Sequence, residues 1–212
     1  MQKIEAVILD LGGVLLNLDY KKTEDAFTAL GISHFAQLFT QHHAGQLFTD
    51  FETGKISPGD FIRSLKKESD KELNDEQVIG AWNAMLLDFP AERIALLKKL
   101  RGRFPLFLLS NTNAIHLPAF NQKLKGAYGI PSLDRLFDKA YYSHLIGLRK
   151  PFLAAYQTVI EENNLDPAAT VFVDDTPGNV EAAEKAGLQA FLLRYPQTIT
   201  ELMEKVVTAA NG

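Results

Sequence analysis

The 212-residue chain contains no cysteine. This absence excludes disulfide bonds, thiolate catalysis and zinc sites built from cysteine, and it is typical of proteins of a reducing compartment. Apolar runs of about 18 or more residues are absent too, and no small-residue cleavage site follows the first apolar run. The sequence therefore predicts neither a transmembrane helix nor a signal peptide, and we expect a cytoplasmic protein with no membrane partner.

Clustered positive charge is also lacking. The 22 Lys and Arg residues are outnumbered by 26 Asp and Glu residues, which gives a net charge of −4, and no basic run could follow a nucleic-acid backbone. We therefore expect no nucleic-acid partner. Hydrophobic residues make up 46% of the chain, which is ordinary for a folded globular protein and excludes disorder. The length predicts one main domain with room for an insertion.

Five short segments rich in β-branched and aliphatic residues predict buried strands. They are residues 4–9, 104–110, 139–143, 169–174 and 188–194, of which 139–143 is the weakest. Continuous apolar runs are typical of strands covered on both faces, as in a parallel sheet. Helical patterns lie between several of them, notably residues 90–102 and residues 176–187, the latter with Thr176 as its expected N-cap. We predict an α/β fold with a doubly wound parallel sheet.

Residues 19–89 break this alternation of strands and helices. They carry helical patterns with few strand candidates, so we predict an all-helical insertion placed directly after the first strand. In this division, residues 1–18 and 90–212 form the α/β core and residues 19–89 form a helical cap. Because ligands of open α/β sheets bind beyond the carboxyl ends of the strands, the cap would roof the site. Within it, residues 45–61 are predicted to form a substrate-facing loop that bends at Gly54.

Polar residues follow the predicted strands at their carboxyl ends. These ends meet at one rim of a parallel sheet, so we expect six side chains to lie together there, namely Asp10, Ser110, Asn111, Lys150, Asp174 and Asp175. Each alone has an ordinary structural explanation, such as a helix cap, a turn or a solvated loop charge. Three carboxylates at one rim repel one another, however, so either a cation lies among them or their pKa values rise. Magnesium, which prefers oxygen ligands, is the expected cation.

Four of these sites, in order and context, resemble the motifs of the haloacid dehalogenase superfamily. The matching stretches are ILDLGGVL around Asp10, LLSNTN around Ser110, GLRKP around Lys150, and VFVDDTPGNVEAAEKAGL around Asp174 and Asp175. The resemblance covers nearly the whole chain and implies a Rossmann-like core with a helical C1 cap at residues 19–89. Details such as DLGGVL, FETGKIS and AWNAMLLDFP are most similar to the branch that contains the α-D-glucose-1-phosphate phosphatases and the N-terminal phosphatase domain of soluble epoxide hydrolases.

The resemblance implies a magnesium-dependent phosphatase acting on a small phosphorylated metabolite. Asp10 would be the nucleophile that forms an aspartyl-phosphate, which water then hydrolyses. Mg²⁺ would be held by the Asp10 carboxylate, the backbone carbonyl of Gly12, and the acidic pair, with Asp175 as a direct ligand and Asp174 bound directly or through water. The family's pattern also implies that the Ser110 hydroxyl and Asn111, with its backbone N–H, hold phosphate oxygens, while Lys150 neutralises charge on the transferring group.

One position departs from the family's pattern. The phosphatases usually carry a second Asp two residues after the nucleophile, as general acid and base, and here that residue is Gly12. General acid–base catalysis typically contributes ~10² to 10⁴-fold. We therefore expect slow hydrolysis of alkyl phosphates and less impaired hydrolysis of esters with better leaving groups, such as sugar 1-phosphates. Residues that could supply the proton instead are Asp19, His42, His43 and Glu52.

Other functions stay open at this point. A haloacid dehalogenase would also use an aspartate nucleophile, on carbon and without a metal, although the retained Asp174 and Asp175 argue against it. A binding protein that kept the fold and lost efficient turnover is the second alternative. Near the second motif, Asn113 and His116 could touch the substrate, although His116 could equally be hydrogen-bonded to backbone. The helical spacing around Trp82 predicts a core residue.

Overall fold

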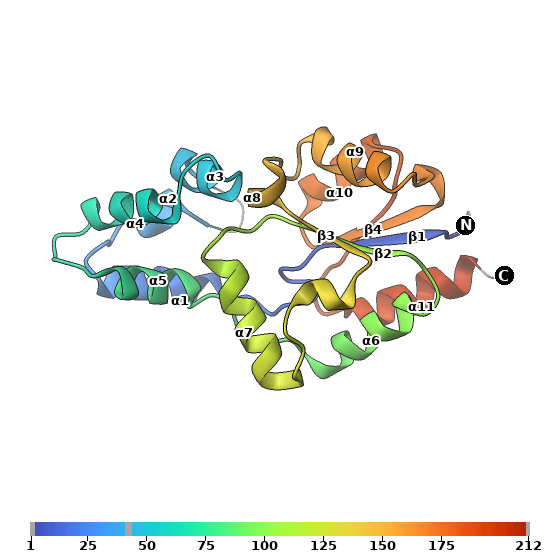
Figure 1. The fold of residues 1–212 in the computed structure, drawn as a ribbon, viewed down its shortest axis with the longest axis horizontal. Coiled ribbons are helices and arrows are strands. Elements are labelled where there is room, and N and C mark those ends of the chain that lie inside the picture. The colour runs from blue at the N-terminus through green and yellow to red at the C-terminus, as the bar shows by residue number, and fades with distance from the viewer. Residues whose placement is uncertain (1–2, 41–43, 211–212) are drawn as a thin grey trace.

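The computed structural model describes residues 3–40 and 44–210 of the chain (Figure 1). The strands are β1 (Ala6–Leu9), β2 (Leu106–Ser110), β3 (Lys139–Tyr142), β4 (Thr170–Asp174) and β5 (Gln189–Leu192). The helices are α1 (Tyr20–Ala29), α2 (Phe35–Leu38), α3 (Gln46–Glu52), α4 (Pro58–Lys67), α5 (Asp75–Asn83), α6 (Ala91–Arg101), α7 (His116–Tyr128), α8 (Ser143–Ile146), α9 (Leu153–Glu162), α10 (Pro177–Lys185) and α11 (Ile199–Ala210), with 3-10 turns at Leu133–Leu136 and Pro167–Ala169.

The five strands form one parallel sheet in the order β3-β2-β1-β4-β5. Strand β1 lies in the centre, with Ile8 opposite Phe107 of β2 on one side and Phe172 of β4 on the other. The predicted parallel α/β sheet is thereby confirmed, including its weakest strand. Because β1, β2 and β4 are adjacent and parallel, the residues that follow their carboxyl ends are neighbours in space.

Helices cover both faces of the sheet. Val7 and Leu9 face the layer that holds α6, α7 and α11, whereas Ala6 and Ile8 face α9 and α10 (Figure 1). All four side chains are at most 2% exposed, as the continuous apolar run predicts. Within residues 3–40 and 44–210, none of the helices is both long and apolar enough to cross a membrane.

Helices α1 to α5 lie together beyond the carboxyl end of β1 (Figure 1). An aromatic cluster joins them: Phe27 stacks on Phe35 with ring centroids 4.3 Å apart, and Phe48 lies 5.4 Å from Trp82. Trp82 is 1% exposed, which confirms that it is a core residue. The division at residues 18 and 90 into core and cap stays a prediction.

The prediction of a loop at residues 45–61 is wrong. Two helices, α3 and α4, occupy most of this range, and only the turn between them at Gly54 matches the expectation, with a φ of +68°. Helix α4 begins with a capping box, in which the Ser57 hydroxyl accepts the N–H of Asp60 while the Asp60 carboxylate accepts the N–H of Ser57. Reciprocal caps of this kind start a helix despite the Gly, Ser and Pro residues around them.

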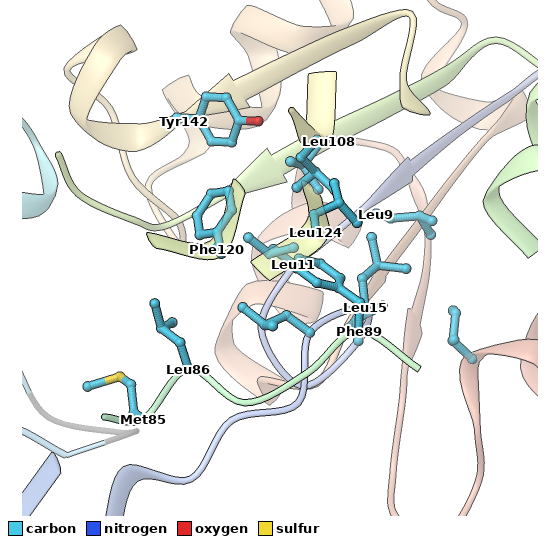
Figure 2. Close-up of a cluster of buried hydrophobic side chains, with 14 of the residues drawn as sticks. Leu9, Leu11, Leu15, Met85, Leu86, Phe89, Leu108, Phe120, Leu124 and Tyr142 are labelled. Atoms are coloured by element: carbon cyan, nitrogen blue, oxygen red, sulfur yellow. The ribbon is translucent and has the colours of Figure 1, made fainter. Parts of the chain in front are cut away.

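Two segments connect the sheet to helices α1 to α5. They pair with each other, since the N–H of Asn17 donates to the Asp88 carbonyl at 2.9 Å and the N–H of Leu87 donates to the Asn17 carbonyl at 3.0 Å. Leu11 and Leu15 of the first segment and Phe89 of the second belong to one buried cluster with residues of α7 (Figure 2). Both connections are therefore anchored in the core next to the carboxyl end of β1.

Candidate active site

The polar residues predicted from the strand ends lie at one rim of the sheet. Asp10 follows β1, Ser110 is the last residue of β2, and Asp174 is the last residue of β4. Lys150 comes from the loop between α8 and α9 and reaches the same place. The parallel topology thus gathers groups that are far apart in the sequence.

Lys150 lies between two carboxylates. Its Nζ is 2.5 Å from Asp10 Oδ1 and 2.5 Å from Asp174 Oδ2, and the residue is 1% exposed. Burial by itself would lower the pKa of Lys150, but the charges and hydrogen bonds of Asp10 and Asp174 outweigh it and raise the pKa above its ordinary value. The ammonium is therefore charged, and it also lies 5.6 Å from the centre of the Phe172 ring.

Asp10, Asp174 and Asp175 form an acidic cluster whose candidate ligand oxygens all lie within 4.8 Å of one another. Burial raises the pKa of Asp10 to about 7, and the charges of the other two acids add to the rise while Lys150 opposes it. The pKa of Asp175 is raised as well, first by burial and then by Asp174. One ammonium among three carboxylates leaves an excess of two negative charges when all are ionised, so the donor set fits a divalent cation with oxygen ligands.

Helix α10 and the turn before it fix the Asp174 carboxylate. Asn179 donates from Nδ2 to both carboxylate oxygens at 3.0 Å, and the backbone N–H of Thr176 donates to Oδ1 at 2.8 Å. Thr176 occupies the N-cap position, as predicted, but its hydroxyl donates to Asp175 Oδ1 at 3.1 Å instead of capping the helix. The acidic pair is therefore held by the start of α10.

The side chain of Asn111 holds the loop that carries Lys150. Its Nδ2 donates to the Lys150 carbonyl at 2.9 Å, and its Oδ1 accepts the Lys150 N–H at 2.9 Å. These two hydrogen bonds engage the Asn111 side-chain amide, which therefore fixes the position of the Lys150 backbone. Asn111 also lines the two cavities that open over the site, so its backbone N–H stays available to a ligand there. Ser110 is buried beside it, at 2% exposed.

The two glycines after Asp10 have different roles. Gly13 has a φ of +70°, and a Cβ at this position would overlap the Asp175 carboxylate, so only glycine fits. A Cβ at Gly12 would lie 2.7 Å from Leu18 Cδ1. Leu18 therefore occupies the space beside Gly12 into which a longer side chain would extend.

Two adjoining cavities open over these groups. The larger has a volume of about 590 Å³ and is lined on the sheet side by Asp10, Lys150 and Asp175. Its other side is formed by Tyr20, Phe39 and Glu52 of the helical segment, by which we mean helices α1 to α5 and their connections. The smaller, of about 70 Å³, is lined mainly by apolar groups together with Ser110, Asn113 and His116. Gly12 and Asn111 line both cavities. The acidic cluster thus faces a space large enough for a phosphate ester.

The candidate proton donors lie in different places. Asp19 caps α1 by accepting the N–H of Lys21 at 3.0 Å and is not among the residues that line the two cavities. Glu52 lines both cavities. Burial raises the pKa of Glu52, while Arg149 opposes the rise. His42 and His43 lie outside the described residues.

His116 and Asn113 tie α5 to the start of α7. The His116 ring stacks on Trp82 with centroids 4.7 Å apart, and its Nε2 lies 3.1 Å from the Trp82 carbonyl oxygen. Burial lowers the pKa of His116 to about 4, so the ring is neutral at physiological pH. Asn113 Oδ1 accepts the backbone N–H groups of Ile115 and His116. Of the two alternatives for His116, the hydrogen bond to backbone is present, and the residue also lines the smaller cavity.

Sequence reasoning missed three residues of the site. Asn179 lies within the fourth motif, five residues after Asp174, and Arg149 directly precedes Lys150 in the third. Both residues belong to motif stretches that resemble the family, and their closeness in sequence to Lys150 and Asp174 is the signal that could identify them. Tyr20 lines both cavities, and nothing in the local pattern separates it from the other apolar residues of α1.

Comparisons with known proteins show what the chain as a whole is similar to. The family described as haloacid dehalogenase-like hydrolase matches residues 4–187. The D-ribitol-5-phosphate phosphatase of Bacteroides thetaiotaomicron is 28% identical over 188 residues, which cover 89% of this chain and 91% of the relative. The sesquiterpene phosphatase astK of Aspergillus oryzae is 30% identical and covers 87% of each chain. The crystal structure of HAD family enzyme bt-2542 from Bacteroides thetaiotaomicron, with magnesium and inorganic phosphate, is 30% identical with a TM-score of 0.83, and the match covers 94% of this chain and 98% of that one.

Proposed function

The chain belongs to the haloacid dehalogenase-like hydrolase family, and from this premise we propose that it is a magnesium-dependent phosphatase of a small phosphorylated metabolite. The observation that carries the proposal is the Lys150 ammonium, 2.5 Å from both Asp10 and Asp174, on the floor of a cavity of about 590 Å³. A carboxylate nucleophile beside a fixed positive charge suits phosphoryl transfer through an aspartyl-phosphate.

The relatives support the same reaction class. Two of them are named as phosphatases, one for D-ribitol 5-phosphate and one for a sesquiterpene, and the related crystal structure holds magnesium and inorganic phosphate. Their substrates differ greatly in polarity, so family membership supports the hydrolysis of a phosphate monoester without naming the alcohol. We propose a sugar phosphate or a similar small ester.

The residues that would hold Mg²⁺ are Asp10, Asp174, Asp175 and the backbone carbonyl of Gly12. The close approach of Gly13 to Asp175 keeps the glycine turn against the acidic pair. When bound, the ion would balance the excess negative charge of the acids and of the phosphate.

Asp10 in its ionised form would attack phosphorus in line with the leaving alcohol. The bond to the ester oxygen breaks as the aspartyl-phosphate forms, and the departing oxygen takes a proton from water. A second water then attacks the acyl phosphate, which releases inorganic phosphate and restores Asp10. Lys150 would neutralise charge on the transferring group throughout. Ser110 and the backbone N–H of Asn111 would hold its oxygens.

Gly12 determines which phosphate esters we expect the protein to hydrolyse fastest. Glycine has no side chain, so position 12 supplies no group that could protonate the leaving alcohol. Esters whose alcohol leaves easily, such as aryl phosphates and sugar 1-phosphates, should therefore be hydrolysed faster than alkyl phosphates. The expected difference is roughly 10²- to 10⁴-fold, the usual contribution of a general acid.

The proposal is tested by measuring inorganic phosphate released from phosphorylated sugars, nucleotides and cofactors, with and without Mg²⁺. We expect release that depends on Mg²⁺ and is lost in Asp10→Asn. The matched control is Asp166→Asn, because Asp166 caps the 3-10 turn before β4, at the far end of that strand from the site, and Asn can serve the same cap. Chloride release from 2-haloacids without metal would instead support a dehalogenase, and tight ester binding without turnover would support a binding protein.

A further inference from the structure

An ion pair in the lining of the larger cavity joins helix α3 to the loop between α8 and α9. Glu52, the last residue of α3, places Oε2 3.0 Å from Nη2 of Arg149, which directly precedes Lys150. Both residues line the cavity of about 590 Å³, and Glu52 is 9% exposed. The catalytic scheme above uses neither side chain.

The pair carries hydrogen-bonding capacity that the protein does not use. Glu52 Oε2 is engaged by Arg149 Nη2, whereas Arg149 Nε is buried and has no hydrogen-bond partner in the described part of the chain. A buried ion pair is costly unless further hydrogen bonds satisfy its remaining lone pairs and protons. Buried polar atoms without partners are rare in folded proteins, and each one calls for an explanation. A ligand in the cavity that offers hydroxyl groups would supply the missing partner.

The backbone fixes the position of the pair. The turn after α3 passes so close to α8 that a Cβ at Gly54 would overlap the carbonyl oxygen of His144, and the φ of Gly54 is +68°. Only glycine permits this contact. Because α8 leads directly into the loop with Arg149 and Lys150, the contact places Glu52 at a set position relative to Lys150.

We propose that Glu52 and Arg149 form a hydroxyl-binding subsite that selects phosphate esters of polyhydroxy alcohols. The inference rests on the proposed phosphatase function and specifies its substrate class. A hydroxyl group both donates and accepts a hydrogen bond, so it can donate to the Glu52 carboxylate and accept from the Arg149 guanidinium. An alkyl or terpenyl ester would cover the same charged atoms without satisfying them, so the pair discriminates against such esters.

The test compares two esters that differ only in hydroxyl groups, a pentitol 5-phosphate and n-pentyl phosphate. Their dissociation constants are measured by calorimetry with Mg²⁺ on Asp10→Asn protein, which is not expected to turn over. We expect the pentitol ester to bind roughly 10- to 100-fold more tightly, the range for hydrogen bonds to charged groups. Adding Glu52→Gln to this protein should lower the preference for the pentitol ester about tenfold or more. The dissociation constant of n-pentyl phosphate should change by less than about threefold.

Two further variants separate binding from structure. The double change Glu52→Gln with Arg149→Met leaves no unpaired buried charge, and it should also lack the preference for the pentitol ester. Glu68→Gln is the matched control, because Glu68 lies in the same helical segment but pairs with His34 at the surface. This change should preserve the preference.

Equal weakening of both esters by Glu52→Gln would show that the pair only holds the helical segment in place, and would overturn the inference. Unchanged binding of both esters, or no binding of the pentitol ester, would overturn it as well. The proposed function fails separately, when wild-type protein with Mg²⁺ releases phosphate from none of the phosphate monoesters tested.

Discussion

Replacing His116 with glutamine removes a histidine that burial keeps neutral. The ring is 7% exposed, stacks on Trp82 and places Nε2 3.1 Å from the Trp82 carbonyl oxygen. Burial lowers its pKa from the ordinary 6.5 to about 4, and the hydrogen bond to the carbonyl opposes part of this change. Between these two pH values the unfolded chain binds a proton that the folded protein does not bind. The stability contributed by His116 is therefore complete above pH 6.5 and is lost as the pH falls towards about 4.

The size of this loss follows from the shift in pKa. A decrease from 6.5 to about 4 corresponds to about 3 kcal/mol of unfolding free energy when the loss is complete. By about pH 4.5, roughly 2.5 kcal/mol of it should already be gone. Below about pH 4, His116 causes no further change, because both states are protonated.

The assay is urea unfolding of wild type and His116→Gln at about pH 7.5 and about pH 4.5, followed by the fluorescence of Trp82, the only tryptophan in the chain. Glutamine can keep a hydrogen bond to the Trp82 carbonyl without titrating. Carboxylates contribute to the pH dependence of both proteins, so the difference between them isolates His116. The wild type should lose about 2.5 kcal/mol more than the variant. Equal losses would refute the conclusion that His116 is buried in its neutral form.

Two further predictions concern the groups around the acidic cluster. Gly13→Ala should raise the Mg²⁺ concentration needed for half-maximal phosphate release about 10- to 100-fold, because the new Cβ displaces Asp175. Gly129→Ala, which has a similar φ of +69° and no neighbour within 4 Å, should cost only about 1 kcal/mol of stability and leave the Mg²⁺ requirement unchanged. Asn179→Ala removes the hydrogen bonds that Asn179 donates to the buried Asp174 carboxylate, and denaturant unfolding should show a loss of roughly 1.5 to 3 kcal/mol. A loss below about 0.5 kcal/mol would mean that the carboxylate finds other partners.

The sheet and the gathering of site residues are predictable from the sequence for a physical reason. A strand covered on both faces must be largely apolar, so segments such as Ala6–Leu9 and residues 171–173 stand out in a chain of mixed polarity. A parallel arrangement then fixes which ends of the strands are neighbours. The positions of Asp10 and Asp174 follow from topology alone, without knowledge of any side-chain packing.

The helical segment is less predictable, because its structure depends on packing. Helix α3 is only seven residues long, and Phe48 and Phe51 become its buried face through contacts with Phe61 of α4. Local composition around Gly54 is typical of a loop. The pairing of Glu52 with Arg149 is not encoded in either local pattern, since it depends on how α3 approaches α8.

The role of Asp10 as nucleophile is tested most directly by identifying the residue that carries the phosphoryl group. Wild-type protein would be mixed with Mg²⁺ and a rapidly hydrolysed phosphate ester, treated with borohydride to reduce any aspartyl-phosphate to homoserine, and digested for mass spectrometry. If Asp10 is the nucleophile, we expect homoserine at position 10 and none at positions 174 and 175. Modification at another position, or phosphate release with position 10 unmodified throughout turnover, would contradict it.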